Sequence, residues 1–317
     1  MIFIQEIKKK IKYFIPHGIV EQRKQRWQKV QDEILLQQRI RENKIKEYFL
    51  SLANIDDPEI LEIINYFKKY DKLIWWFPYF FSREYFPMDV DVYFCSVTKA
   101  RYVIHENKKL YFPKSWESDV IRCYYNNLRR EQDKDSPHRY ETGAITVKEG
   151  DVIVDVGAAE GIWALTHAEK AKKIYLFESS REWVEALEKT FAPWKEKIII
   201  SNKYISDIDD RINTTRDTYF NSAEEINFIK IDIEGMELKL INGSKNILSR
   251  NNNLKVVLCA YHGDNDAIDL KQALEKNGYE TEYSKGYMIC SYDENLKEPY
   301  IRRGIVRARK NIWQAKD

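Results

Sequence analysis

One short apolar run, which breaks into an acid and two glycines, limits what this chain can fold into. It lies in residues 151–161, DVIVDVGAAEG, and the helical pattern IWALTHAEKA follows at once. A near-continuous run of β-branched residues is typical of a strand that is buried on both faces of a parallel sheet. The segment therefore predicts a strand, a tight turn and a helix, the unit of doubly wound α/β proteins.

The turn also indicates the charge of its ligand. Asp155 stands where a dinucleotide-binding fingerprint has its first glycine, which disfavours a pyrophosphate and suits a cation such as the sulfonium and α-ammonium of S-adenosylmethionine (SAM). Glu178 ends the next predicted strand about 20 residues later, where an acid can accept hydrogen bonds from both ribose hydroxyls. The predicted cofactor contacts are Asp155, Gly157, Ala158, Glu160, Gly161, Glu178, Ser179, Ser206 and Asp207. Gly157 lets the backbone approach the ligand, Gly161 lets the helix pack on the strand, and Ser206-Asp207 ends the third strand near the expected adenine.

Composition excludes several classes of protein. The 317 residues carry a net charge of +2, but the basic excess is confined to residues 1–50 and 297–317, so the body between them is acidic. That distribution disfavours nucleic-acid binding. The four cysteines form neither a CxxC pair nor a disulfide pattern, and we find no 18-residue apolar run or signal peptide. We therefore expect a cytoplasmic protein.

The chain divides into four predicted parts. Residues 1–70 are a helical arm, 71–136 a small α+β unit, 137–295 the main domain, and 296–317 a basic tail. In the arm, residues 1–16 predict a basic amphipathic helix that packs on the protein or on a second subunit, with docking on an anionic membrane surface as the alternative. The helical stripe of residues 21–50 favours a homo-oligomer.

Strands and helices alternate through the main domain. Further strands are predicted in residues 172–178, 197–207, 226–235 and 253–262, and a hairpin in 280–293 closes the sheet with an antiparallel edge. In the small unit, strands are predicted in residues 89–97 and 102–112, with a turn at 106–108, and a helix follows in 115–132. The aromatic run LIWWFPYFF before them is typical of a core plug.

Polar residues gather where the predicted strands end, which is where such sheets bind ligands. Lys230, Asp232 and Glu234 alternate along one face of the fourth strand, and His262 ends the fifth. An acceptor hydroxyl needs a general base, for which His262 is the candidate, or a cation that lowers its pKa. Asp232, Glu234 and His262 are then the candidate ligands of Mg²⁺ or Mn²⁺. The alternative is a structural ion pair. His138 and Tyr140, in the loop before the first strand, are further candidates for ligand contact.

At these residues the sequence resembles the FkbM-type family of SAM-dependent methyltransferases. The resemblance covers about residues 137–292 and rests on GDVIVDVGAAEG, on Glu178 and on FIKIDIEGMELKLINGS. It implies the seven-stranded class I methyltransferase sheet, to which the pattern of the residues themselves adds a mainly helical N-terminal extension and a small β-containing unit. It also implies cofactor contacts at Asp155, Gly157 and Glu178, and O-methylation of a sugar or polyketide-like acceptor. Arg216 precedes Asp217 where the family usually has leucine, and residues 1–130 match no family pattern.

The function expected from the sequence is SAM-dependent O-methylation of a sugar hydroxyl, on a nucleotide-activated sugar or a glycan intermediate of a surface polymer such as capsular polysaccharide. The catalytic candidates are His262, Asp232, Glu234 and Lys230. One alternative is an NAD-dependent oxidoreductase, against which Asp155 argues. The other is a non-catalytic scaffold of the same fold, against which the retained strand-end residues argue.

Overall fold

The computed structural model describes residues 17–205, 213–214, 225–244, 248–249 and 252–310, in two units that divide after Leu52. The first unit contains α2 (His17–Ser51), a helix of 35 residues, so the helix predicted for residues 21–50 is confirmed. Large apolar side chains of α2 are about half exposed, among them Ile34, Leu35 and Ile40. The homo-oligomer expected from this stripe stays a prediction, and the helix predicted for residues 1–16 lies outside the described residues.

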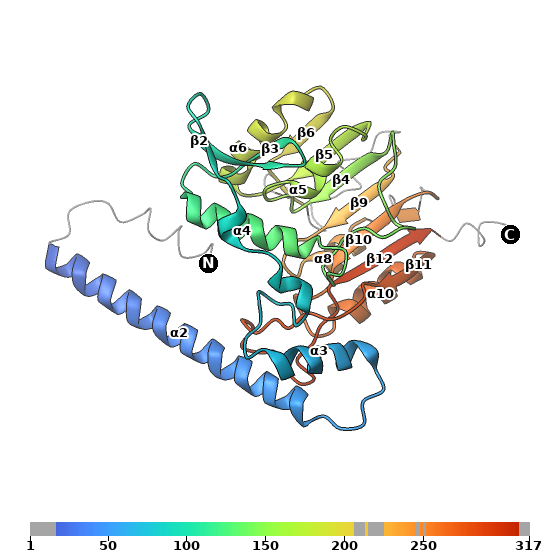
Figure 1. Ribbon diagram of the computed structural model, residues 1–317. Coiled ribbons are helices and arrows are strands. Elements are labelled where there is room, and N and C mark those ends of the chain that lie inside the picture. The colour runs from blue at the N-terminus through green and yellow to red at the C-terminus, as the bar shows by residue number, and fades with distance from the viewer. Residues whose placement is uncertain (1–16, 206–212, 215–224, 245–247, 250–251, 311–317) are drawn as a thin grey trace. The chain divides into compact units, whose positions relative to one another are not determined.

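The second unit is built around a seven-stranded sheet, as predicted (Figure 1). Its strands in chain order are β4 (Val152–Val156), β5 (Lys173–Phe177), β6 (Ile198–Ser201), β9 (Phe228–Ile231), β10 (Lys255–Cys259), β11 (Tyr279–Tyr283) and β12 (Ile305–Lys310). In space the order is β11-β12-β10-β9-β4-β5-β6, and β12 is antiparallel to both of its neighbours. The strands from β10 to β6 pair in parallel.

Helices and short connections complete this unit. They are α3 (Pro58–Lys69), η1 (Phe80–Arg83), η2 (Pro87–Asp89), α4 (Ser118–Glu131), α5 (Ile162–Thr166), α6 (Arg181–Thr190), η3 (Ala192–Trp194), α8 (Glu237–Asn242) and α10 (Asp266–Lys276), with the strand pair β7 (Tyr204–Ile205) and β8 (Asn213–Thr214). Every residue of β4 is buried, which explains its continuous apolar pattern. The core joins the apolar side chains of the central strands to Leu240 and Ile241 of α8 and to Leu270 and Leu274 of α10.

The order of the strands fixes where a ligand can bind. From β4 the chain moves outward through β5 to β6, and then returns to the other side of β4 to form β9 and β10. The switch in direction therefore lies between β4 and β9. A crevice opens beyond the carboxyl ends of the strands at such a point.

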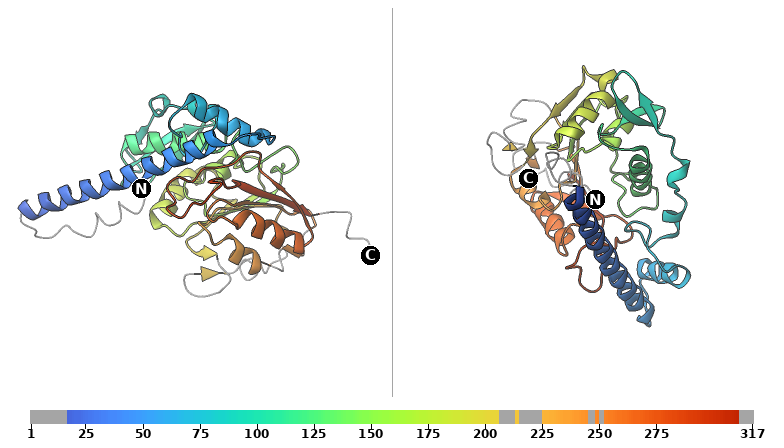
Figure 2. Two further views of the ribbon diagram at one scale, coloured as in Figure 1. Left: turned by 90° about the horizontal axis from the view of Figure 1, so that it is seen from below. Right: turned by 90° about the vertical axis from the view of Figure 1, so that its left-hand side faces the viewer.

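The small unit has its own three-stranded sheet of β1 (Tyr93–Cys95), β2 (Ala100–His105) and β3 (Lys108–Tyr111). The turn predicted at residues 106–108 joins β2 to β3, and the predicted helix is α4. This sheet lies against α6 (Figure 2), where the amide of Tyr111 donates to Thr190 Oγ1 at 3.0 Å. The strands predicted in this segment are confirmed, whereas the division into a separate small unit of residues 71–136 stays a prediction.

The predicted hairpin in residues 280–293 is wrong. Only its first arm forms a strand, and the partner of that strand is β12, which the sequence analysis placed in a basic tail. The sequence did not indicate the pairing of β11 with β12 because about 20 residues separate the two strands and because β12 contains buried Arg307. The guanidinium of Arg307 donates to the carbonyl oxygens of Tyr140 (2.9 Å) and Arg139 (2.6 Å), which makes its burial tolerable.

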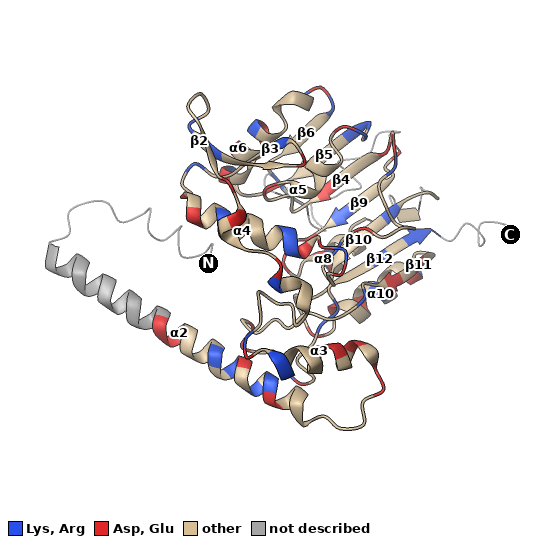
Figure 3. Cartoon of the chain, in the orientation of Figure 1, with Lys and Arg blue, Asp and Glu red and all other residues tan. Residues whose placement is uncertain are grey.

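Acidic and basic side chains are interspersed along the described part of the chain (Figure 3). No helix among the described residues is long and apolar enough to cross a membrane.

Candidate active site

A buried ion pair lies at the switch point between β4 and β9. Asp155 in β4 and Lys230 in β9 are register partners, and Lys230 Nζ lies 2.9 Å from Asp155 Oδ1 (Figure 3 shows the acidic and basic positions on these neighbouring strands). Lys230 also donates to the carbonyl oxygen of Gly157 at 2.8 Å. Burial alone would lower the pKa of Lys230, but the carboxylates of Asp155 and Asp232 raise it, so the ammonium stays charged. Lys230 therefore neutralises Asp155, the carboxylate that was predicted to contact a cationic ligand.

The turn after β4 is tightly packed. Gly157 has a φ of +74°, and a Cβ built on it would lie 1.9 Å from the carbonyl oxygen of Asp232. The amides of Gly157 and Ala158 both donate to the carbonyl oxygen of Phe177, at 3.0 Å each. A Cβ on Gly161 would meet the side chains of Leu187 and Phe191. The close approach at Gly157 is thus to Asp232, and Gly161 makes room for the α6 region rather than for a strand.

Glu178, which directly follows β5, ties this turn to α6. Its carboxylate accepts hydrogen bonds from the amides of Ala159 (2.9 Å) and Ser180 (2.6 Å). Burial raises the pKa of Glu178 although both amides lower it. Ser179 is half-buried and its carbonyl oxygen accepts from Asn202. Ser206 and Asp207 lie outside the described residues.

A small cavity opens between the turn, Lys230 and α4. Its lining includes Leu128, Glu131, Tyr140, Asp155, Glu160 and Lys230. Glu160 accepts a hydrogen bond from Tyr124 at 2.9 Å, and burial raises its pKa to about 7. Glu131 accepts from the indole of Trp75 at 3.1 Å, and burial together with Asp232 and Glu160 raises its pKa to about 8. Three carboxyl groups share this cavity with one lysine, so a cation bound there would favour the ionised forms of Glu131 and Glu160.

His262, which follows β10, lies between two carboxylates. Its Nδ1 is 3.2 Å from Oε1 of buried Glu237, and its Nε2 is 3.7 Å from Asp232 Oδ1. Burial would lower the pKa of His262, but the contact with Glu237 and the charge of Asp232 raise it. The same Glu237 oxygen accepts the amide of Ile233 at 2.9 Å, which fixes the carboxylate in place.

Glu234, predicted to share this face, does not. The strand ends at Ile231, and Glu234 adopts a φ of +54° and is exposed. The period-two pattern fails there because the backbone has left the extended conformation. Glu237, at the start of α8, occupies the place that the strand pattern assigned to Glu234. Glu237 lies in the run FIKIDIEGMELKLINGS, but no pattern in the sequence indicated a role for it.

The loop before β4 supplies two more buried groups. Tyr140 donates to Asp232 Oδ2 at 3.1 Å, so Tyr140 and His262 both contact this carboxylate. His138 Nε2 lies 3.3 Å from the hydroxyl of Tyr261 and 3.7 Å from Cys259 Sγ. His138 is fully buried rather than solvated as loop histidines usually are, and burial lowers its pKa to about 4. His138 is therefore neutral at physiological pH.

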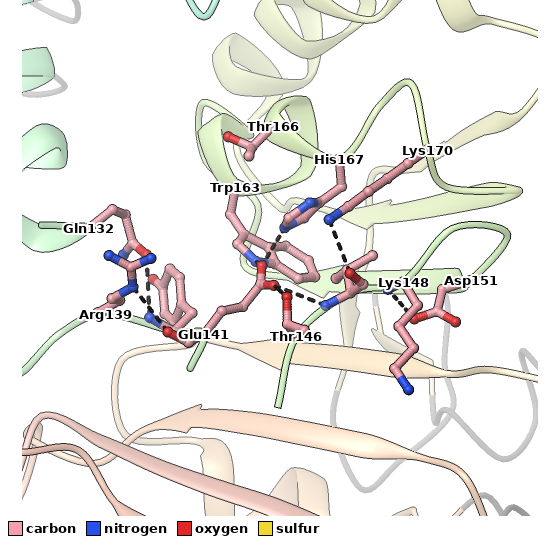
Figure 4. A network of polar contacts seen from close by, with 12 residues as sticks. Gln132, Arg139, Glu141, Thr146, Lys148, Asp151, Trp163, Thr166, His167 and Lys170 are labelled. Carbon is pink, nitrogen blue, oxygen red and sulfur yellow. Dashed lines mark hydrogen bonds and ion pairs between the residues drawn. The ribbon is translucent and has the colours of Figure 1, made fainter. Parts of the chain in front are cut away.

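Glu141 anchors the same loop to α5 (Figure 4). Its carboxylate accepts from Trp163 Nε1 (2.8 Å), Thr146 Oγ1 (2.6 Å) and the amide of Val147 (2.9 Å), and it contacts His167. Burial would raise the pKa of Glu141, but the contact with His167 and the hydrogen bonds from Thr146 and Val147 lower it to about 2. The network holds the segment that carries Tyr140. No sequence motif indicated it.

Comparison with known protein families gives a match within the main domain. Residues 206–281, which include Lys230, Asp232, Glu237 and His262, match the family model described as the methyltransferase FkbM domain. A search of curated proteins found no match.

Among solved structures, the chain is similar to the methyltransferase FkbM of Methylobacillus flagellatus KT, with 16% identity and a TM-score of 0.41 over 60% of this chain and 53% of that one. It is also similar to Trm5b of Pyrococcus abyssi, with 11% identity and a TM-score of 0.39 over 67% of this chain and 56% of that one. The chain thus spans about half the length of these two relatives. The match of residues 206–281 supports an FkbM-type methyltransferase domain in this part of the chain.

Proposed function

We propose that this methyltransferase transfers a methyl group from SAM to a sugar hydroxyl, with His262 as the general base. The observation that carries the proposal is the position of His262 between Glu237 and Asp232, close to the carboxyl ends of β9 and β10. Bound SAM supplies an electrophilic methyl group on a sulfonium. The chain has to hold that cation, orient the acceptor and take the proton of its hydroxyl.

The donor set fits SAM better than it fits a dinucleotide. The cavity lined by Asp155, Glu131 and Glu160 favours a cation, and Glu178 lies at the end of β5, where it has acceptor capacity left for ribose hydroxyls. A pyrophosphate would need free amides at the turn. The amides of Gly157 and Ala158 are already bonded to Phe177. These contacts support SAM over the NAD-dependent alternative.

The proton path follows from the contacts of the imidazole. Glu237 next to Nδ1 favours the tautomer with its proton on that nitrogen, which leaves the lone pair of Nε2 for the acceptor hydroxyl. The 3.7 Å between Nε2 and Asp232 is longer than a hydrogen bond, and Asp232 then stabilises the imidazolium that forms. Tyr140 holds Asp232 from the other side.

The same contacts argue for a base over a metal. Asp232, Glu237 and His262 have donor atoms within 4.8 Å of one another, which is compatible with a divalent ion. However, both imidazole nitrogens face carboxylates, and Mg²⁺ prefers oxygen donors and water. We therefore propose catalysis through His262, with Mg²⁺ or Mn²⁺ as the alternative that the test below separates.

The first test compares binding of SAM and NAD by calorimetry. SAM is expected to bind and NAD is not, and Glu178→Ala should weaken SAM by about 1.5–3 kcal/mol, the usual loss for a hydrogen bond to a charged group. Unchanged affinity in this variant would remove Glu178 from the cofactor site.

The second test measures methyl transfer to a panel of glycans and nucleotide sugars. His262→Ala should lower the rate by about 10²–10⁴-fold while SAM still binds, and EDTA should have no effect. Loss of turnover with EDTA and its recovery with Mg²⁺ or Mn²⁺ would replace the base with a metal. Near-normal turnover in the variant, with and without EDTA, would contradict both mechanisms.

A further inference from the structure

We propose that Trp75, Trp76 and Tyr292 form a stacking platform for the pyranose ring of an uncharged glycan acceptor. This inference rests on the proposed function, because it assigns the acceptor side of the same site. From the sequence, the aromatic run that contains the two tryptophans was predicted to fill the hydrophobic core. Phe77 and Tyr79 of that run are buried, but Trp75 is 40% exposed.

The three rings contact one another in series, with Trp76 in the middle. The rings of Trp75 and Trp76 are stacked, with centroids 4.6 Å apart and planes inclined by 29°. The ring of Tyr292, 46% exposed, lies 5.4 Å from that of Trp76. Two exposed aromatic side chains that pack against a half-buried third leave aromatic surface open to a ligand.

This platform borders the catalytic candidates on two sides. The ring of Trp76 lies 5.5 Å from that of Tyr261, which in turn lies 4.3 Å from the imidazole of His262. The indole of Trp75 donates to Glu131, which lines the acid-rich cavity with Asp155. The platform is therefore linked to the proposed base through Tyr261 and to the acid-rich cavity through Glu131.

The platform also lies near a different strand from the residue predicted to bind the ribose of SAM. Tyr261 follows β10, whereas Glu178 follows β5, and β9 and β4 separate these two strands. The adenosine side and the platform thus flank the switch point from opposite directions. This separation argues against the platform as a second stacking site for adenine.

The chemistry of the surface favours a sugar. The face of an aromatic ring carries partial negative charge, which attracts the weakly positive C–H bonds of a pyranose face. Trp75 has a φ of +61°, a rare conformation for a bulky residue, which occurs where surrounding contacts demand it. Its hydrogen bond to Glu131 is such a contact, and the carboxylate retains capacity to accept from a sugar hydroxyl.

The charges near the platform favour a neutral glycan over a nucleotide sugar. Arg302 pairs with Asp264 (2.6 Å) and Asp293 (2.5 Å), and Lys230 pairs with Asp155. These cations are therefore already paired with carboxylates, and Glu131, which accepts from Trp75, adds a further acidic group beside the platform. A pyrophosphate placed there would face carboxylates without a free counter-charge.

The test measures binding of neutral disaccharides to the full chain by ligand-observed NMR. The probes are N,N′-diacetylchitobiose, lactose and mannobiose, with UDP-N-acetylglucosamine as the charged comparison. At least one disaccharide should bind at millimolar concentration, and Trp75→Ala and Tyr292→Ala should each weaken it roughly 3- to 10-fold. Tyr292→Phe should retain binding because it keeps the ring, and the matched control Phe86→Ala removes an exposed aromatic residue that lies outside the platform.

The outcomes separate this inference from the proposed function. If no disaccharide binds, or if both alanine variants bind as the wild type does, the platform is wrong whatever the result of the SAM titration. Tighter binding of UDP-N-acetylglucosamine than of every neutral probe would overturn the uncharged acceptor. Sugar binding that depends on Trp75 in a protein that fails to bind SAM would support the platform and refute the methyl-transfer proposal.

Discussion

Gly157→Ala tests the geometry of the turn, because this glycine faces two independent penalties. Its φ of +74° costs an alanine roughly 1–2 kcal/mol. The new Cβ would also lie 1.9 Å from the carbonyl oxygen of Asp232, and since a backbone atom cannot rotate away, the repacking costs a further ~1–3 kcal/mol. We expect a total loss of about 2–5 kcal/mol in the free energy of unfolding.

Gly150→Ala is the matched control. Gly150 has a φ of +80°, but a Cβ there would meet nothing within 4 Å, so only the conformational cost of ~1–2 kcal/mol applies. Urea denaturation of both variants and the wild type gives the difference directly. Equal losses in the free energy of unfolding in the two variants would show that Gly157 and the carbonyl oxygen of Asp232 are not in close contact.

Three further variants address the buried charges. Glu141→Leu should lower the free energy of unfolding at neutral pH. The difference from the wild type should shrink as pH falls from about 5 toward 2, because the ionised Glu141, whose pKa is lowered in the folded state, loses its charge in this range. A difference in the free energy of unfolding that does not change with pH would contradict this. Lys230→Met leaves Asp155 buried without its partner and should cost about 3–5 kcal/mol in chemical denaturation, whereas the double variant with Asp155→Leu should recover much of it. Glu237→Gln should lower kcat about 10- to 100-fold by loosening His262, and a larger effect of Glu234→Gln would restore the pattern predicted from the sequence.

The sequence predicted most of the sheet because its strands repeat a strong local signal. β4, β5, β9 and β10 are short apolar runs followed by polar residues, and their alternation with helices indicates parallel pairing. The spacing also placed Asp155, Lys230, Asp232 and His262 at one edge. β12 escaped detection because its pairing depends on residues far away in the sequence, and because a buried arginine looks like part of a basic tail.

The site itself was harder to predict where contacts join separate elements. Trp75 and Glu131 lie on different segments of the small unit, and no local pattern links a tryptophan to a carboxylate 56 positions away. Glu237 was missed for a different reason. The alternating strand pattern of the sequence continues past Ile231, but the strand itself ends there. The chain then turns, with a positive φ at Glu234, so that Glu237 contacts His262 instead.

The surplus of carboxylates in the cavity leads to one more prediction about the methyl donor. SAM and its product, S-adenosylhomocysteine, both carry an α-ammonium, but only SAM carries the sulfonium charge. Glu131 and Glu160 have pKa values raised to about 8 and about 7, so both are largely protonated at pH 6 and ionised at pH 9. The ratio of SAM affinity to product affinity should therefore rise across this range, since titration of the shared amino group cancels in the ratio. Calorimetry at several pH values measures it, and the double variant Glu131→Gln/Glu160→Gln should flatten the dependence. A ratio that is flat in the wild type would mean that these carboxylates do not face the sulfonium, and that the cavity serves another part of the reaction.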